Sequence, residues 1–236
     1  MRNLLWILLC VCWMPLALAG VSIEGTRIIF PADSTSVGVQ LRNEFSTPAL
    51  VQVWIDNGNM DEMPAAEEIP FVLSPPLSRI EPKQGQIIRI LQTDSSQLAE
   101  DRESLFWFNM LDIPPENPDL AGENVLTFTV RTRIKLFYRP KKLKMTVNNA
   151  FKNLQFEYLQ DEQKVEIKNP TPYYITFANL VLKTTSGDRT YQKSVMLSPF
   201  SSQKLEDFKL PAKPNQVSYA ALNDLGGIQT MSKNMN

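Results

Sequence analysis

The stretch Val125-Leu-Thr-Phe-Thr-Val-Arg-Thr-Arg-Ile-Lys-Leu-Phe-Tyr138 decides the fold class. Apolar and polar side chains alternate along it, and a period of two predicts a β-strand. The apolar face of this strand would carry Leu126, Phe128, Val130, Ile134 and Leu136. At about 3.3 Å per residue the strand would span roughly 46 Å, which is longer than one β-sandwich usually needs. The pattern alone favours a core strand with one solvated face, and the alternative is an exposed edge at which a partner strand adds.

Further runs of strand length lie on both sides of this stretch, separated by proline-rich or polar turns. Before it lie Val37–Leu41, Leu50–Ile55, Ile87–Leu91 and Leu105–Leu111, and after it lie Leu154–Tyr158, Val165–Ile167, Ile175–Leu182, Ser194–Leu197 and Val217–Leu222. No helical stripe of ten or more residues is present, and Ser95–Glu100 is expected to form at most one turn. The strand series restarts after Arg139-Pro140-Lys141-Lys142. The sequence therefore predicts an all-β chain of two sandwiches, with a boundary near residues 140–145.

The N-terminus has the three parts of a secretory signal peptide. Met1-Arg2-Asn3 is followed by an apolar stretch from Leu4 to Leu18 and by Ala17-Leu18-Ala19. The apolar stretch is short for a membrane span. We therefore expect residues 1–19 to be a leader that is cleaved after Ala19, which leaves 217 of the 236 residues.

Composition excludes several classes of function. The chain has no histidine, and both cysteines, Cys10 and Cys12, leave with the leader. Zinc sites built on His or Cys, thiol catalysis, Ser-His-Asp catalysis and disulfides are thereby excluded, and no metal or cofactor is expected. The mature charge of −2 argues against nucleic-acid binding.

Charged and aromatic residues outside the strand cores have ordinary explanations on sequence alone. The basic residues from Arg131 to Lys144 are interpreted as a solvated strand face and linker, and Arg27 as a solvated side chain. Trp54, Trp107 and Phe108 are assigned to core packing. Paired acids occur at Asp61-Glu62, Glu67-Glu68 and Glu100-Asp101 with Glu103. They are interpreted as solvated turns, and a carboxylate-dependent hydrolase stays open as an alternative.

Six segments, in this order along the mature chain, carry a resemblance to a known family. They are Gly20–Phe30 with Arg27, Phe71–Pro82 with its double proline, Leu98–Pro115, Arg133–Pro140, Asn169–Ile175 and Asn223–Gly227. The chain resembles the PapD-like periplasmic chaperones of the chaperone–usher pilus pathway. The segment between Ile113 and Val125 is short, and this resembles the short-loop subclass of that family.

The resemblance implies a fold and roles for particular residues. It implies two immunoglobulin-like domains, residues 20–142 and 143–236, set at an angle with a cleft between them. It assigns Arg27 and Lys135 to an anchor for the C-terminal carboxylate of a pilin subunit. It assigns donor side chains and an inter-domain ion network to two further sets, which are Leu126, Phe128 and Val130, and Glu103, Arg139 and Asp224.

The resemblance also implies a function without catalysis. The protein would capture pilin subunits in the periplasm by donor-strand complementation and deliver them to an outer-membrane usher, with no nucleic-acid partner, no cofactor and no membrane insertion of the mature chain. The alternative is a secreted immunoglobulin-like structural or adhesive protein, such as a fimbrial subunit. A difficulty is that Lys135 has the opposite parity to the donor residues, so the strand must twist or the subunit must wrap around it.

Overall fold

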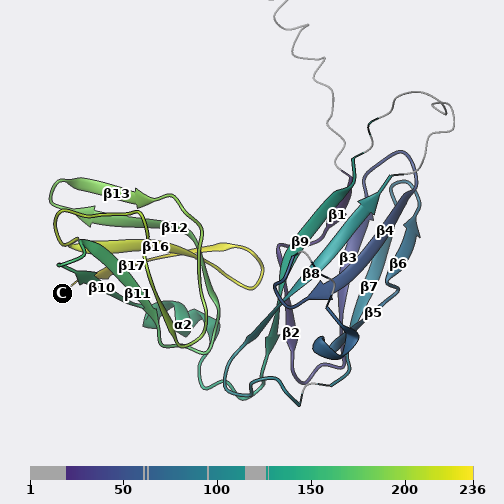
Figure 1. The fold of residues 1–236 in the computed structure, drawn as a ribbon, viewed down its shortest axis with the longest axis horizontal. Helices are drawn as coiled ribbons and strands as arrows, with labels where there is room; N and C mark the ends of the chain where they lie inside the picture. Colours follow the sequence, from purple (N-terminus) through teal and green to yellow (C-terminus); the bar gives the residue numbers. More distant parts are fainter. Residues whose placement is uncertain are drawn as a thin grey trace, which may run out of the picture.

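The computed structural model describes residues 20–60, 62, 64–94, 96–114, 126 and 128–235, which fold into two β domains that lie side by side at an angle (Figure 1). The predicted leader with Cys10 and Cys12, the residues Val125 and Thr127, and most of the segment between Ile113 and Val125 lie outside the described residues. The predicted resemblance to the short-loop subclass depends on that segment. No helix in the described part of the chain is both long and apolar enough to cross a membrane. The predicted fold class, two β-sandwich domains, is confirmed.

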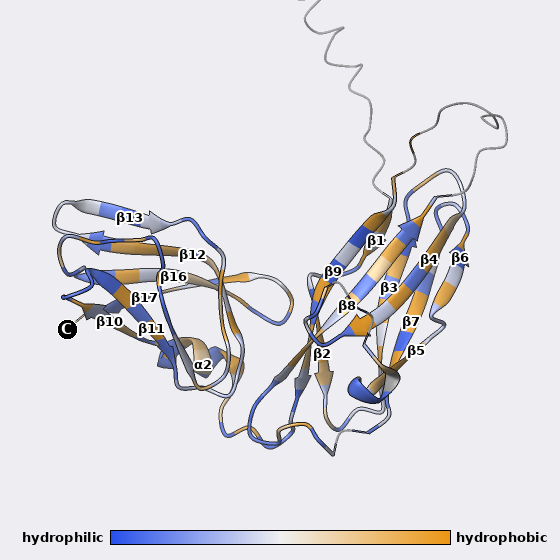
Figure 2. Cartoon of the chain, viewed as in Figure 1, coloured by the Kyte–Doolittle hydropathy of each residue, from blue (hydrophilic) through white to orange (hydrophobic). Residues whose placement is uncertain are grey.

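Two packed sheets build the N-terminal domain. One has the strand order β1-β3-β7-β5, and the other has the order β2-β9-β8-β4-β6. Their bounds are Val21–Ile23 for β1, Arg27–Pro31 for β2, Ser36–Asn43 for β3, Ala49–Asp56 for β4, Phe71–Ser74 for β5, Leu77–Ile80 for β6, Gly85–Gln92 for β7, Ser104–Ile113 for β8 and Val130–Arg139 for β9. Alternating side chains such as Phe30, Leu41, Ile90 and Phe108 are fully buried between the sheets. Figure 2 shows this alternation as apolar and polar bands along the strands.

The first two strands belong to different sheets, and this switch leaves part of an edge uncovered. β1 pairs with β3 in the first sheet, whereas β2 pairs in parallel with β9 in the second. Gly25 makes the crossing with φ 99°, a backbone conformation that only glycine adopts readily. Because β2 begins at Arg27 opposite Lys135, it covers only Lys135–Arg139 of β9. Within the described residues, the earlier part of β9 is paired on the β8 side alone.

The C-terminal domain is a second sandwich with its own core. One sheet has the order β10-β11-β15, and the other has the order β13-β12-β16-β17 with β14 paired to β12. Their bounds are Gln155–Leu159 for β10, Lys164–Asn169 for β11, Ile175–Thr184 for β12, Gly187–Tyr191 for β13, Val195–Leu197 for β14, Ser201–Lys204 for β15, Gln216–Leu222 for β16 and Ile228–Asn234 for β17. The loop between β16 and β17 reaches toward the N-terminal domain (Figure 1). The core of this domain is a separate cluster of buried side chains.

Helical structure is confined to short segments, one of which the sequence patterns do not predict. The α-helix α2, Val147–Asn153, begins at Thr146, whose side chain accepts a hydrogen bond from the Asn149 amide, and it buries Ala150 and Phe151. Seven residues are too few to produce an amphipathic stripe of ten or more residues in the sequence. A 3₁₀ turn, η1, spans Ala66–Glu68.

The strand predicted over Val125–Tyr138 is too long at its N-terminal end. β9 begins at Val130, which pairs with Asp112 just before β8 ends at Ile113. Within the part of the chain that the structure describes, Phe128 and Thr129 therefore have no strand beside them and take no regular hydrogen-bonding pattern. The patterning is that of a strand, but a strand needs a neighbour to satisfy its backbone groups.

Candidate functional site

Two cations lie together where the open edge of β9 ends. Arg27 is the first residue of β2 and is paired in register with Lys135 of β9. Side chains of residues paired across adjacent strands leave the sheet on the same face, so both cations project from the outer face of the β2-β9-β8-β4-β6 sheet. The structure thus brings together the two residues that the resemblance assigns to an anchor.

Both cations contact the C-terminal domain. Arg27 Nη1 donates a hydrogen bond to the carbonyl oxygen of Leu222 at 3.1 Å, and Lys135 Nζ lies 3.5 Å from Thr176 Oγ1. Their inner sides rest on aromatic rings, Phe137 beneath Arg27 and Trp107 beneath Lys135. The Nε atom of Arg27 is buried and has no hydrogen-bond partner within the described part of the chain. The pair therefore lies at the junction of the two domains, and Arg27 Nε can still donate a hydrogen bond to a ligand.

The electrostatics of the pair favour an anionic ligand. Burial lowers the pKa of Arg27, although Asp224 and Glu103 act in the opposite direction. Burial also lowers the pKa of Lys135, and the charge of Arg27 lowers it further. Two partly desolvated cations with no carboxylate at ion-pair distance, among the described residues, are stabilised when an anion binds between them. The arrangement suits a carboxylate.

A row of exposed apolar side chains precedes the open edge. Leu126, Phe128 and Val130 expose 76%, 72% and 59% of their surface. They have the same parity as Ile134 and Leu136, which pack into the core of the N-terminal domain. The core-facing row of β9 therefore continues beyond the sandwich, where no second sheet covers it among the described residues. Lys135 has the opposite parity, so within β9 its side chain projects from the face opposite to that of Val130.

Arg139 links the domains through a network of ion pairs. Its Nε donates to Glu103 at 2.8 Å, and its two terminal nitrogens donate to the two carboxylate oxygens of Asp224 at 2.7 and 2.8 Å. The other oxygen of Glu103 accepts a hydrogen bond from the Tyr174 amide at 2.8 Å. Since Glu103 and Arg139 belong to the N-terminal domain and Asp224 and Tyr174 to the C-terminal domain, the network fixes one against the other.

Glu103 is the most enclosed member of this network. It is 3% exposed, and burial raises its pKa while Arg139 and the Tyr174 amide oppose that effect. The Glu103 amide also donates to the Pro172 carbonyl oxygen at 2.9 Å. Tyr174 packs against Phe137 in a tilted arrangement, with 5.6 Å between ring centroids. Backbone groups of Pro172, Tyr174 and Leu222 thus complete the site, and no sequence pattern identifies such groups in advance.

The interpretation of Arg131 and Arg133 as simply solvated residues is wrong. Arg133 forms an ion pair with fully buried Asp56, and Arg131 donates to Asn109, which in turn donates to Asp56 at 2.7 Å. Burial raises the pKa of Asp56, but the hydrogen bonds from Arg133, Asn109 and the Gly58 amide outweigh burial and hold that pKa below its usual value. These interactions brace β9 against β8 and β4.

The assignment of Trp54 and Trp107 to the core is also wrong. The Arg131 guanidinium lies 4.9 Å from the Trp54 ring, and the Arg133 guanidinium lies 4.1 Å from the Trp107 ring. Both indoles lie on the outer face of the sheet because their parity is opposite to that of buried Phe108. The tryptophans share this face with the arginines of β9 through the register of β4, β8 and β9, which alternation within a single strand does not give.

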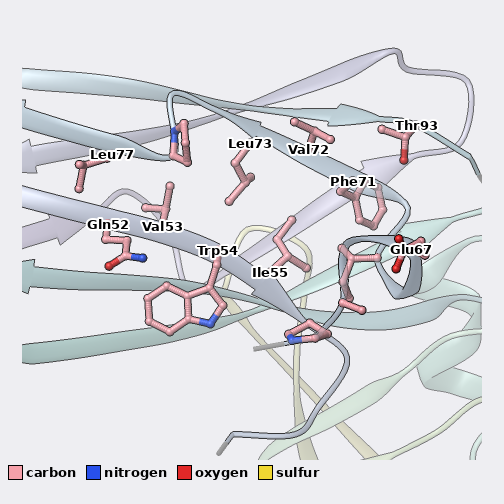
Figure 3. Close-up of a pocket in the computed structure, with 14 residues that line it drawn as sticks. Gln52, Val53, Trp54, Ile55, Glu67, Phe71, Val72, Leu73, Leu77 and Thr93 are labelled. Atoms are coloured by element: carbon pink, nitrogen blue, oxygen red, sulfur yellow. The ribbon is translucent and has the colours of Figure 1, made fainter. Parts of the chain in front are cut away.

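A separate apolar hollow lies at another part of the N-terminal domain. It has a volume of about 790 Å³ and is lined by residues of β4, β5, β6 and the segment around η1, among them Val53, Leu73 and Leu77. Figure 3 shows Val53 and Ile55 on the side of β4 that faces the hollow, while Trp54 points the other way. None of the predicted site residues lines it.

Comparison with protein families matches both domains. Residues 20–144 match the model described as the pili and flagellar-assembly chaperone, PapD N-terminal domain, and residues 149–233 match the model of the pili assembly chaperone PapD, C-terminal domain. The chain is 40% identical over 225 residues to the probable fimbrial chaperone YadV of Escherichia coli K12, with 92% of this chain and 91% of YadV covered.

Solved structures give the same result. The crystal structure of the YadV chaperone matches with a TM-score of 0.77 at 36% identity, and it covers 92% of this chain and 100% of that one. The SafB chaperone, solved in complex with the SafA pilin of Salmonella enterica, matches with a TM-score of 0.77 at 26% identity and covers 94% and 99% of the two chains. The periplasmic chaperone SfaE matches with a TM-score of 0.71 at 28% identity and covers 90% and 98%.

Proposed function

Because the chain belongs to the PapD family of pili-assembly chaperones, we propose that it captures pilin subunits by lending them the open edge of β9 and the apolar row before it. The protein is thus a fimbrial chaperone. Its family consists of chaperones, and both of its domains match, which favours this function over that of a fimbrial subunit or a hydrolase.

The observation that carries the proposal is the uncovered edge of β9 next to exposed Leu126, Phe128 and Val130. Such an edge invites pairing with another chain, and natural proteins normally suppress it. A pilin that lacks one strand has a row of unpaired backbone groups and an open apolar groove. β-strand addition satisfies the backbone groups of both chains, and alternate donor side chains fill the groove.

The anchor gives the added strand a direction. β2 runs parallel to β9 and begins at Arg27, so a strand that continues the line of β2 and also runs parallel to β9 would end at Arg27. Its C-terminal carboxylate would then meet Arg27 and Lys135. An antiparallel strand would bring a positively charged N-terminus to the same two cations. We propose that this charge selection sets the parallel orientation and the register of the subunit.

The energies assign different tasks to the two parts of the site. Burying the three donor side chains contributes about 1.5–3 kcal/mol each, roughly 5–9 kcal/mol together before the cost of ordering. A charge-assisted hydrogen bond to the carboxylate contributes about 1.5–3 kcal/mol. The apolar row therefore supplies most of the affinity. The anchor supplies register, which decides which side chain enters which pocket of the subunit.

The remaining parts of the proposal concern location, processing and delivery. We propose that residues 1–19 are a cleaved leader, that residues 20–142 and 143–236 are the two domains, and that the mature protein works in the periplasm and hands its subunit to an outer-membrane usher. The leader pattern supports export, and the matched ranges 20–144 and 149–233 support the domain division. The complex of the SafB chaperone with the SafA pilin supports a pilin as partner.

Co-expression with a pilin subunit and recovery of the complex from the periplasm tests the proposal. Phe128→Asp is expected to abolish recovery of the subunit, because it would place a charge in the apolar groove. Ile87→Asp is the matched control, since Ile87 is a similarly exposed apolar residue, 54% exposed, on β7 of the other sheet. Equal recovery with both variants would refute the donor assignment.

A further inference from the structure

The carboxylate of Asp112 is buried, and only one of its two oxygens has a hydrogen-bond partner among the described residues. Asp112 lies near the end of β8 and is 5% exposed. Its Oδ2 accepts a hydrogen bond from the Val21 amide at 3.0 Å, whereas its Oδ1 is buried and has no partner among the described residues. A buried carboxylate oxygen without a donor is costly, so such an atom indicates that a partner is missing.

Gly20 lies directly against this carboxylate. A Cβ atom added at Gly20 would lie 2.4 Å from Asp112 Oδ2 and 3.2 Å from the Phe45 ring, so a larger residue would displace one of them. The Gly20 carbonyl oxygen also accepts a hydrogen bond from the Glu44 amide at 3.3 Å. The backbone of Gly20 is therefore held on both sides, next to the unsatisfied acid.

We propose that removal of the leader creates the missing partner, because it turns the nitrogen of Gly20 into an α-ammonium group that pairs with Asp112. This inference rests on the cleavage after Ala19 proposed above. A protease of the signal-peptidase class adds water across the Ala19–Gly20 peptide bond. Ala19 leaves as a carboxylate, and the nitrogen of Gly20 takes up protons to become an ammonium group. An uncleaved chain has at this nitrogen one uncharged N–H, whereas the cleaved chain has three charged donors.

The other charged groups near Gly20 already have partners. Glu44 forms an ion pair with Arg42 at 2.8 Å, and the ammonium group of Lys83 donates to the Glu44 carbonyl oxygen. Among the described residues, Asp112 Oδ1 is the buried carboxylate oxygen that has no hydrogen-bond partner. A neighbouring carboxylate favours the charged form of an amine, so the pair would be present at neutral pH.

The position of the pair connects it to the donor strand. Val21 opens β1 in one sheet, and Asp112 belongs to β8 in the other, so the pair ties the two sheets of the N-terminal domain together. Asp112 is also the register partner of Val130, where β9 begins and the exposed donor row ends. Leader removal would therefore add a charged contact at the base from which the donor segment extends, where the precursor has only the hydrogen bond from the Val21 amide.

Stability measurements on four proteins test the inference without any pilin. The first chain begins at Gly20, the second retains three leader residues and begins at Ala17, and each is made with and without Asp112→Asn. In the chain that begins at Gly20, Asp112→Asn is expected to raise the unfolding equilibrium constant in urea at least tenfold more than in the chain that begins at Ala17. The α-amine of Gly20, followed by NMR, is expected to titrate at higher pH with Asp112 than with the Asn variant.

Three results would overturn the inference. These are an equal effect of Asp112→Asn in both chains, an α-amine that titrates identically with and without Asp112, and a mass for the periplasmic protein that shows cleavage at another bond. Subunit capture is measured separately with the Phe128→Asp variant. A failure of the inference is thereby distinguished from a failure of the proposed function.

Discussion

At the scale of single residues, the anchor combines partial burial of charge with the absence of a counter-ion in the described part of the chain. Lys135 loses hydration at the junction of the domains, and this lowers its pKa. The charge of Lys135 therefore adds little to the stability of the free chaperone, whereas a bound carboxylate would form an ion pair with it. The same reasoning applies to Arg27, whose Nε has no hydrogen-bond partner there.

Lys135→Met is therefore expected to weaken subunit binding while leaving the free chaperone as stable as the parent protein. Loss of a charge-assisted bond of about 1.5–3 kcal/mol corresponds to about 10- to 150-fold weaker affinity. Arg27→Ala should weaken binding in the same direction. Binding measured by calorimetry with a purified subunit checks this. Lys141→Ala is the control, because Lys141 is 72% exposed and pairs with Asp33 outside the site. Parental affinity in the Lys135 variant would contradict the anchor.

At the scale of elements, the crossing from β1 to β2 creates the open edge. If β1 continued straight into β2, it would cover the first half of β9 and leave no place for a partner strand. The crossing depends on Gly25 at φ 99°. The conformation of a single glycine thus decides how much of β9 stays open. Of the 10 residues of β9, β2 covers only the second half.

Gly25→Ala is expected to destabilise the protein by about 1 kcal/mol, because a side chain disfavours positive φ. Urea unfolding measures the change. Gly38→Ala is the control, since Gly38 has no positive φ and an added Cβ would meet only the Ile87 side chain, at 3.3 Å. An equal loss of stability in both variants would show that the crossing does not depend on the conformation of Gly25.

The sequence predicted strands well where hydrophobic periodicity determines them. It predicted elements poorly where they depend on contacts with neighbouring parts of the chain. The alternation around β3, β4, β7 and β8 is enough to locate these strands, because each has a buried face. The start of β9 was placed too early, because alternation continues past the last residue that has a partner. The α-helix α2 escaped prediction because its stability comes from a cap and two buried residues rather than from a long stripe.

The same distinction applies to the site. The resemblance to a family named Arg27, Lys135 and the network around Arg139, but spacing alone could not bring together residues separated by about 85 to 195 positions. The stacking of Arg133 on Trp107 and its pairing with Asp56 needed the sheet order, which the sequence patterns do not give.

At the scale of the whole molecule, we propose that the ion pairs of Arg139 hold the two domains in one orientation. Because the anchor cations contact Leu222 and Thr176 of the C-terminal domain, a change in orientation would also move the surroundings of the anchor. For the ion pair between Arg139 and Asp224, the effect on the geometry of the site is of greater consequence than the effect on stability. The side chain of Asp224 is 39% exposed, and ion pairs of that kind contribute under about 1 kcal/mol.

Asp224→Ala is accordingly expected to lower the free energy of unfolding by under about 1 kcal/mol while broadening the range of domain orientations. Small-angle X-ray scattering should detect the second effect as a larger radius of gyration. Asp207→Ala is the control, because Asp207 pairs with Lys193 within the C-terminal domain. Identical scattering from the Asp224 variant and the parent would contradict the orienting role of the network.

The central claim is that a pilin strand adds to the open edge of β9 in line with β2. Hydrogen–deuterium exchange of the chaperone, free and bound to a subunit, tests this most directly. We predict strong protection on binding in the peptides that cover residues 126–135, and unchanged exchange in β5 and β6 around the hollow of Figure 3. Protection confined to β5 and β6, with exchange at residues 126–135 unchanged, would contradict the claim.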